Sequence, residues 1–63
     1  MKINKEIKAA RKSKGLLQSE MARRLGITDQ AYSMYETGER TPVIGMAAKI
    51  AEAMGMKFSV KFE

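Results

Sequence analysis

The stretch QSEMARRLGITDQAYSMYET, residues 18–37, contains two short helical patterns joined by a tight turn. The first pattern ends at Gly26, where a turn this tight needs a backbone with positive φ. Thr28 follows as an N-cap, so the second helix is predicted over Asp29–Thr37. The apolar residues that fix the crossing of the two helices are Met21, Leu25, Ile27, Tyr32 and Tyr35, with the small Ala22 at the close approach. The stretch therefore predicts two short helices that share a core.

The flanking sequence predicts two further helices. Asn4 is a candidate N-cap for a helix over Lys5–Lys14, and Gly15 ends it. After the loop at Pro42, a fourth helix begins between Val43 and Met46 and ends near Met54, with Gly55 as its cap. The predicted fold class is a mostly α, four-to-five-helix bundle in a single domain over residues 1–63.

The last segment, residues 57–62, changes to a period of two. Phe58, Val60 and Phe62 alternate with polar residues, which predicts a half-buried β-strand. A lone strand leaves backbone groups unpaired, and residues 1–3 offer only a short partner. We therefore expect this strand to pair antiparallel with its copy in a homodimer, with its apolar face on the fourth helix near Ile50 and Met54.

Composition excludes several classes of function. The chain of 63 residues has no cysteine and no histidine, which excludes disulfides and argues against zinc, haem and iron–sulfur sites. It also has no Gly-rich phosphate loop and no evident pair of catalytic carboxylates, so we expect no enzyme, no metal, no cofactor and no small-molecule ligand. No apolar run approaches a membrane span and no signal peptide is visible, so the expected location is the cytoplasm.

The positive charge is concentrated in the first part of the chain. The net charge is +5 overall, but residues 1–24 hold eight basic and two acidic residues, a net +6. A basic surface on a small domain indicates an anionic partner, either nucleic acid or a membrane. The narrow apolar stripe of the first helix argues against a membrane surface.

The two helices of residues 18–37 look like a helix-turn-helix, and the whole chain resembles the phage-repressor and Cro-like helix-turn-helix domains of the XRE family. The resemblance covers Ile7 to Met56. It is carried by Ile7-Lys8, Arg11-Lys12, Lys14-Gly15-Leu16, Gln18, Ala22 through Thr28, Ser33 through Glu36, Gly38, Thr41-Pro42, Lys49 through Ala51 and Met54-Gly55. In such domains the second helix enters the major groove of DNA.

The resemblance implies roles for particular residues. Base contacts are expected from Asp29, Gln30, Ser33 and Met34 on the outward side of the second helix. Phosphate contacts are expected from Lys14, Gln18, Arg23, Thr28, Thr37, Arg40 and Thr41. Gln18 would also buttress the recognition helix, and Arg11 would form a largely buried ion pair with Glu36. The alternative for each exposed residue is an ordinary solvated face.

The sequence departs from the family pattern at several positions. Leu17 stands where a capping side chain is usual, which costs the second helix about 1 kcal/mol. Val43 and Gly45 replace a polar start of the fourth helix, and Asp29 and Met34 are unusual on the reading face. The four methionines at apolar positions, namely Met21, Met46, Met54 and Met56, are interpreted as core filler rather than a metal site.

The sequence therefore predicts a sequence-specific regulator of transcription that binds double-stranded DNA as a homodimer. We expect a repressor that reads a palindromic operator through residues 29–37. The alternative is the antitoxin of a toxin–antitoxin operon, which would bind DNA and also a toxin protein. A small co-transcribed toxin gene next to this one would favour the antitoxin.

Overall fold

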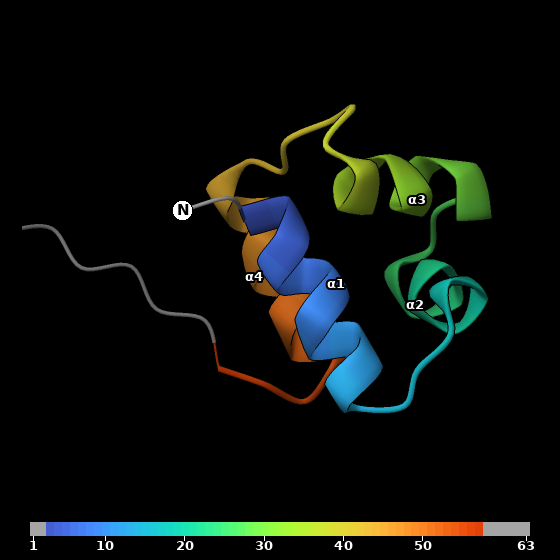
Figure 1. Cartoon of the computed structure of the whole chain (residues 1–63), viewed down its shortest axis with the longest axis vertical. Helices are drawn as coiled ribbons and strands as arrows, with labels where there is room; N and C mark the ends of the chain where they lie inside the picture. Colours follow the sequence, from blue (N-terminus) through green and yellow to red (C-terminus); the bar gives the residue numbers. More distant parts are fainter. Residues whose placement is uncertain (1–2, 58–63) are drawn as a thin grey trace, which may run out of the picture.

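In the computed structural model, the described residues are 3–57, and they form four α-helices (Figure 1). Helix α1 spans Ile3–Ser13, α2 spans Gln18–Leu25, α3 spans Asp29–Thr37 and α4 spans Ile44–Ala53. Helix α3 packs against α1 and α2, and α2 also packs against α4. The arrangement places α3 at one side of the bundle, so that one of its faces points away from the other helices described (Figure 1).

The ends of α2 and α3 follow from three residues. Gly26 adopts a left-handed conformation, with a φ of 71°, and ends α2. The hydroxyl of Thr28 accepts a hydrogen bond of 3.1 Å from the backbone N–H of Ala31, which caps the start of α3. Gly38, with a φ of 92°, ends α3 and donates its N–H to the carbonyl of Met34. The predicted bounds of both helices are correct.

The core lies where α1, α2, α3 and α4 meet. Tyr32, Met21 and Ile50 are its largest fully buried side chains, each from a different helix. The other members are Ile7, Ala22, Tyr35 and Met54. Burial of a large apolar side chain contributes roughly 1.5–3 kcal/mol. Both tyrosines are core residues, as predicted.

The prediction that Asn4 caps α1 from outside is wrong. Helix α1 begins at Ile3, so Asn4 lies inside its first turn. Its side-chain amide donates 2.6 Å to the carbonyl of Tyr35 and 3.2 Å to the carbonyl of Arg40. Carbonyls near a helix C-terminus lack N–H donors within the helix, and the Asn4 amide supplies a donor to the Tyr35 carbonyl near the end of α3.

The C-terminal part of the prediction is tested only at its start. Lys57 has no regular secondary structure, and Phe58, Val60 and Phe62 lie outside the described residues. Met56 is predicted on an apolar face, but 39% of it is exposed. Residues 3–57 contain no strand. The sequence offers residues 1–3 as a short strand that could pair with the C-terminal segment, but Ile3 is the first residue of α1.

Candidate nucleic-acid interface

The outward face of α3 carries the side chains that are predicted to read bases. Gln30, Ser33, Met34 and Thr37 follow a helical spacing of three and four residues, which aligns them on one face. Gln30 and its neighbour Asp29 are exposed, whereas Ser33 and Met34 are half-buried. The helix thus presents a row of polar groups next to one flexible apolar side chain.

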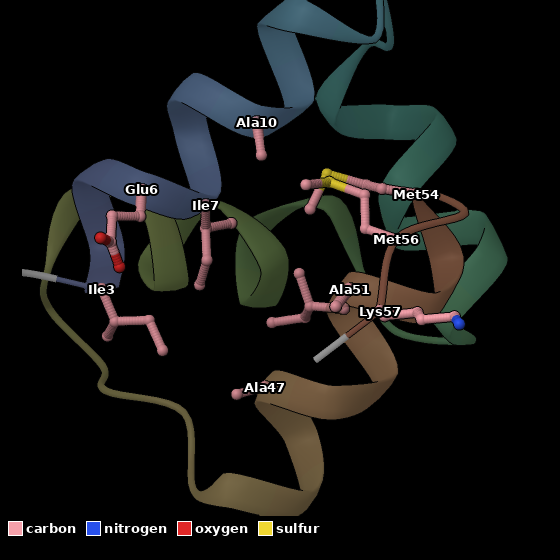
Figure 2. Close-up of a pocket in the computed structure, with 10 residues that line it drawn as sticks. Ile3, Glu6, Ile7, Ala10, Ala47, Ala51, Met54, Met56 and Lys57 are labelled. Carbon is pink, nitrogen blue, oxygen red and sulfur yellow. The ribbon is translucent and has the colours of Figure 1, made fainter. Parts of the chain in front are cut away.

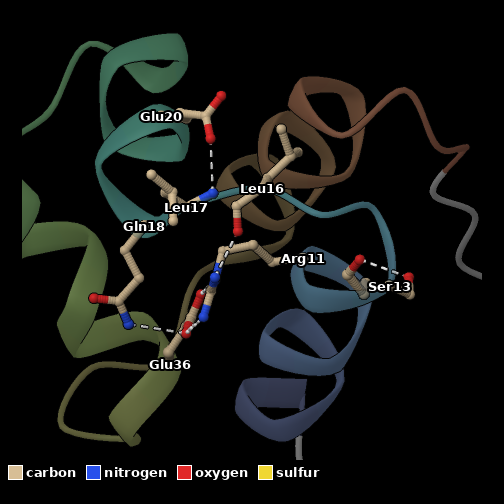
Figure 3. A network of polar contacts seen from close by, with 8 residues as sticks. Arg11, Ser13, Leu16, Leu17, Gln18, Glu20 and Glu36 are labelled. Carbon is tan, nitrogen blue, oxygen red and sulfur yellow. Dashed lines mark hydrogen bonds and ion pairs between the residues drawn. The ribbon is translucent and has the colours of Figure 1, made fainter.

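The inward face of α3 is held by a buried ion pair (Figure 3). The Arg11 Nε lies 2.6 Å from Glu36 Oε2, and the Arg11 Nη2 lies 3.2 Å from Glu36 Oε1. The two side chains are only 10% and 1% exposed. Arg11 also donates to the carbonyl of Leu16 at 2.6 Å, and Gln18 donates to Glu36 at 3.0 Å. This Arg11–Glu36–Gln18 network joins α1 and the start of α2 to the end of α3.

The network sets the ionisation of its members. Burial works to raise the pKa of Glu36, but the hydrogen bonds from Arg11 and Gln18 outweigh burial and hold that pKa below its ordinary value. The Tyr32 hydroxyl is buried and makes no hydrogen bond to a described residue. Burial, together with the nearby Glu36 carboxylate, raises the pKa of Tyr32 well above its ordinary value. The carboxylate is therefore charged and the phenol neutral at pH 7.

The start of α2 lies beside this network. Leu17 adopts the extended conformation of an N-cap, but its side chain has no acceptor and is 64% exposed. Glu20 supplies the return half of a capping box by accepting 2.9 Å from the Leu17 N–H (Figure 3). Gln18 donates one amide hydrogen to Glu36 and so contacts the end of α3, whereas its predicted roles at a phosphate and in support of the recognition helix stay predictions.

The loop between α3 and α4 carries the residues predicted to flank the reading helix. Arg40 and Thr41 are exposed, and the Arg40 guanidinium carbon lies 5.7 Å from the centre of the Tyr35 ring. The Thr37 hydroxyl bonds locally, to the Met34 carbonyl at 3.3 Å and to the Glu39 carboxylate at 3.2 Å. Thr37 is therefore less free to meet a phosphate than its exposure alone indicates.

The remaining predicted phosphate contacts, Lys14, Arg23 and Thr28, are exposed. The sequence did not predict two side chains that donate hydrogen bonds to backbone carbonyls of other parts of the chain. Arg24 donates 2.7 Å to the carbonyl of Ala53 and so joins α2 to the end of α4. Asn4 joins α1 to the end of α3. Lys and Arg side chains often donate to the last carbonyls of a helix. The sequence does not indicate that Arg24, near the end of α2, donates to a carbonyl of another helix.

The described residues offer neither a metal cluster nor a membrane span. Within residues 3–57, no group of three or more acidic, cysteine or histidine side chains could hold a metal ion. Of the four helices described, none has the length and apolar character needed to cross a membrane.

A helix-turn-helix family model matches residues 7–60, which is most of the chain. The protein therefore belongs to the XRE-type helix-turn-helix family, as the sequence resemblance indicated. The match covers α2 and α3 together with the ion-pair partners on α1 and α3. No solved structure matches the chain significantly.

Curated relatives carry names from the same class. YqaF of Bacillus subtilis, an uncharacterized HTH-type transcriptional regulator, is 34% identical over 61 residues, which cover 97% of this chain and 80% of YqaF. A regulator of Methanothermobacter thermautotrophicus is 41% identical over 49 residues, covering 78% and 71% of the two chains. The cryptic phage CTXphi transcriptional repressor RstR of Vibrio cholerae is 37% identical over 54 residues, covering 86% of this chain but only 48% of RstR.

Proposed function

We propose that this protein is a sequence-specific regulator of transcription, a repressor, that reads a palindromic operator in double-stranded DNA through α3. The observation that carries the proposal is the contrast within α3, whose mainly polar outer face is at least partly exposed while its inner face is held by a buried ion pair. A reading helix needs both properties, because its side chains must reach bases and its orientation must not drift. The regulator names of the relatives support the same class.

Each outward side chain has a chemistry that suits a base edge in the major groove. Gln30 can bond the N6 and N7 atoms of adenine with both ends of its amide. Ser33 can bond several base edges, and Met34 can contact a thymine methyl group. Asp29 can accept from cytosine N4, although its charge opposes the approach of phosphates. Arg40, Lys14 and Arg23 would neutralise backbone phosphates and position the helix without reading sequence.

We also propose that the regulator is a homodimer assembled through residues 57–62. An apolar groove of about 160 Å³ lies between α1 and α4, and its lining includes Ile7, Ala47 and Met54 (Figure 2). Ile50 lines the same groove. Lys57, which leads into the segment, lines the same groove. Packing Phe58, Val60 and Phe62 there, with strand pairing across a two-fold axis, would bury apolar surface that a 63-residue domain needs for stability.

The DNA-binding proposal is tested by titrating the protein into a fluorescent 30-base-pair duplex at several salt concentrations. We expect log affinity to fall linearly with log salt, because each neutralised phosphate releases about 0.9 counterions. The control is the same titration with a duplex-sized polyanion without bases, such as heparin, which competes for charge but offers no groove. Absence of duplex binding at low salt would refute the proposal.

The dimer proposal is tested by sedimentation at micromolar concentration. We expect the full chain to sediment as a dimer, and a chain that ends at Met56 or carries Phe58→Ser and Phe62→Ser to sediment as a monomer of lower stability. Lys61→Ser, on the polar face of the same segment, is the matched control and leaves the dimer intact. A shortened chain that stays dimeric and equally stable refutes the strand interface.

A further inference from the structure

Asn4 connects two parts of the chain that are remote in sequence. It is half-buried in the first turn of α1, and its amide donates to the carbonyls of Tyr35 and Arg40, 31 and 36 residues away. The amide oxygen faces Gly38, where an added Cβ would lie 3.9 Å from it. One side chain therefore spans the end of α3 and the loop that follows.

Arg40 makes three contacts with its surroundings, through its backbone N–H, its carbonyl and its guanidinium group. Its backbone N–H donates 3.2 Å to the carbonyl of Met34, and its own carbonyl accepts from Asn4. Its guanidinium lies over the ring of Tyr35, 5.7 Å from the ring centre, at a distance where cation–π attraction acts. Tyr35 is only 6% exposed, so the platform under the guanidinium belongs to the core.

The charge of Arg40 is nevertheless available to an outside anion. In the part of the chain that the structure describes, the one ion pair within 4.0 Å joins Arg11 to Glu36, and no carboxylate pairs with Arg40. The residue is exposed, and it lies three positions beyond Thr37, the last residue of α3. A guanidinium held in place but not neutralised is suited to a phosphate oxygen.

We propose that Asn4 is a positioning residue for DNA binding, which holds the loop after α3 so that Arg40 meets a backbone phosphate beside the reading helix. The inference rests on the proposed DNA-binding function and goes beyond it, because it assigns a part in phosphate recognition to a residue of α1 that acts through Arg40. Asn4 itself need not touch DNA.

The test compares the salt dependence of four full-length proteins on one 30-base-pair duplex of random sequence. They are the wild type, Arg40→Gln, Asn4→Leu and the double variant. Leucine has the same number and branching of side-chain heavy atoms as asparagine, and it removes both N–H donors. We expect Arg40→Gln to reduce the slope of log affinity against log salt by about 0.9 for each phosphate that is no longer neutralised. Asn4→Leu should also make this negative slope less steep, and the slope of the double variant should equal that of Arg40→Gln alone.

A matched control separates positioning from general weakening of α1. Ala9→Gly lowers the helix propensity of the same helix at an exposed position and leaves both Asn4 bonds in place. We expect it to melt earlier but to keep the wild-type slope. Circular dichroism establishes folding for each variant, and Asn4→Ser, with a shorter donor, provides the same readout if Asn4→Leu does not fold.

The ways in which the proposal can fail are distinguishable. If the wild type does not bind the duplex, the proposed function fails and this inference fails with it. If the wild type binds and Asn4→Leu keeps its affinity and slope, only the positioning role is overturned. Effects that add in the double variant, or an Arg40→Gln protein that binds like the wild type, overturn it as well.

Discussion

Polar side chains on the inner and outer faces of α3 differ in their burial and in their hydrogen bonding. On the inner face, Glu36 is 6% exposed and accepts hydrogen bonds from both Arg11 and Gln18. On the outer face, the side chain of Gln30 is exposed and makes no hydrogen bond to another residue of the range 3–57. A buried charge stabilises only when it is fully paired, whereas an exposed amide contributes little to stability and remains free to bind. Substitutions on the two faces should therefore separate folding from recognition.

The largest effect is expected on the inner face. Glu36→Ala leaves the Arg11 guanidinium buried without its partner, which we expect to lower the free energy of unfolding by about 3–5 kcal/mol. The measurement is thermal melting of Glu36→Ala, Arg11→Ala and the double variant. In the double variant the decreases in stability should not add, because both residues belong to one network. If each single variant lowered the free energy of unfolding by less than about 0.5 kcal/mol and the two decreases added, the pair would be uncoupled. The inner face of α3 would then stabilise the fold no more than the outer face does.

Acid should weaken the same network. The pKa of Glu36 is lowered in the folded protein, so the unfolded chain takes up a proton there first, near the ordinary value of 4.5. The stability that the carboxylate contributes is complete above that pH, and it is lost as the pH falls through the lower folded value. We expect the difference in stability between the wild type and Glu36→Gln to shrink in this range. A difference that is constant from pH 7 to pH 3 would contradict the assignment.

On the outer face the expected effect is on base preference and not on folding. Gln30→Ala should reduce discrimination at one base pair of each half-site by about 1–3 kcal/mol. Its melting temperature should match the wild type, because the side chain is exposed and makes no hydrogen bond to a described residue. Binding to a preferred site and to its single-base variants measures the preference. Unaltered preference would mean that Gln30 does not read a base.

The smallest effect is expected at the start of α2. Leu17→Thr supplies a side-chain acceptor at an N-cap that already has the required extended backbone, and should stabilise the protein by about 1 kcal/mol. Leu17→Ala is the matched control, since it shortens the same exposed side chain without adding an acceptor. Urea titration measures both. A threonine variant no more stable than the alanine variant would contradict the interpretation that α2 lacks a side-chain cap.

The sequence predicted the local features of α2 and α3 well, because their ends depend on neighbouring residues. Gly26, Thr28 and Gly38 act within one helical turn, so their types alone indicate where the helices begin and end. The missing cap at Leu17 was expected from the resemblance, because a capping side chain is usual at that position of the family pattern. The Arg11–Glu36 pair came from the family resemblance, since nothing in the spacing of two residues 25 positions apart indicates contact.

The long-range anchors could not be predicted in this way. Asn4 carries a local N-cap signal, and the structure uses it instead for carbonyls 31 and 36 residues away. Arg24 has the sequence pattern of a solvated cation on α2, yet it donates to the carbonyl of Ala53. Both acceptors are backbone groups, which every residue offers, so the partner depends on the packing of the helices rather than on residue type.

The central claim is that the outer face of α3 reads DNA, and selection of bound sites from a pool of random duplexes tests it most directly. We predict enrichment of a near-palindromic sequence with half-sites about 34 Å apart, one turn of the DNA helix. Selection with Gln30→Ala should return the same spacing with relaxed preference at one position per half-site. A pool that shows no enriched sequence after repeated rounds, at salt where the protein still binds, would contradict the claim.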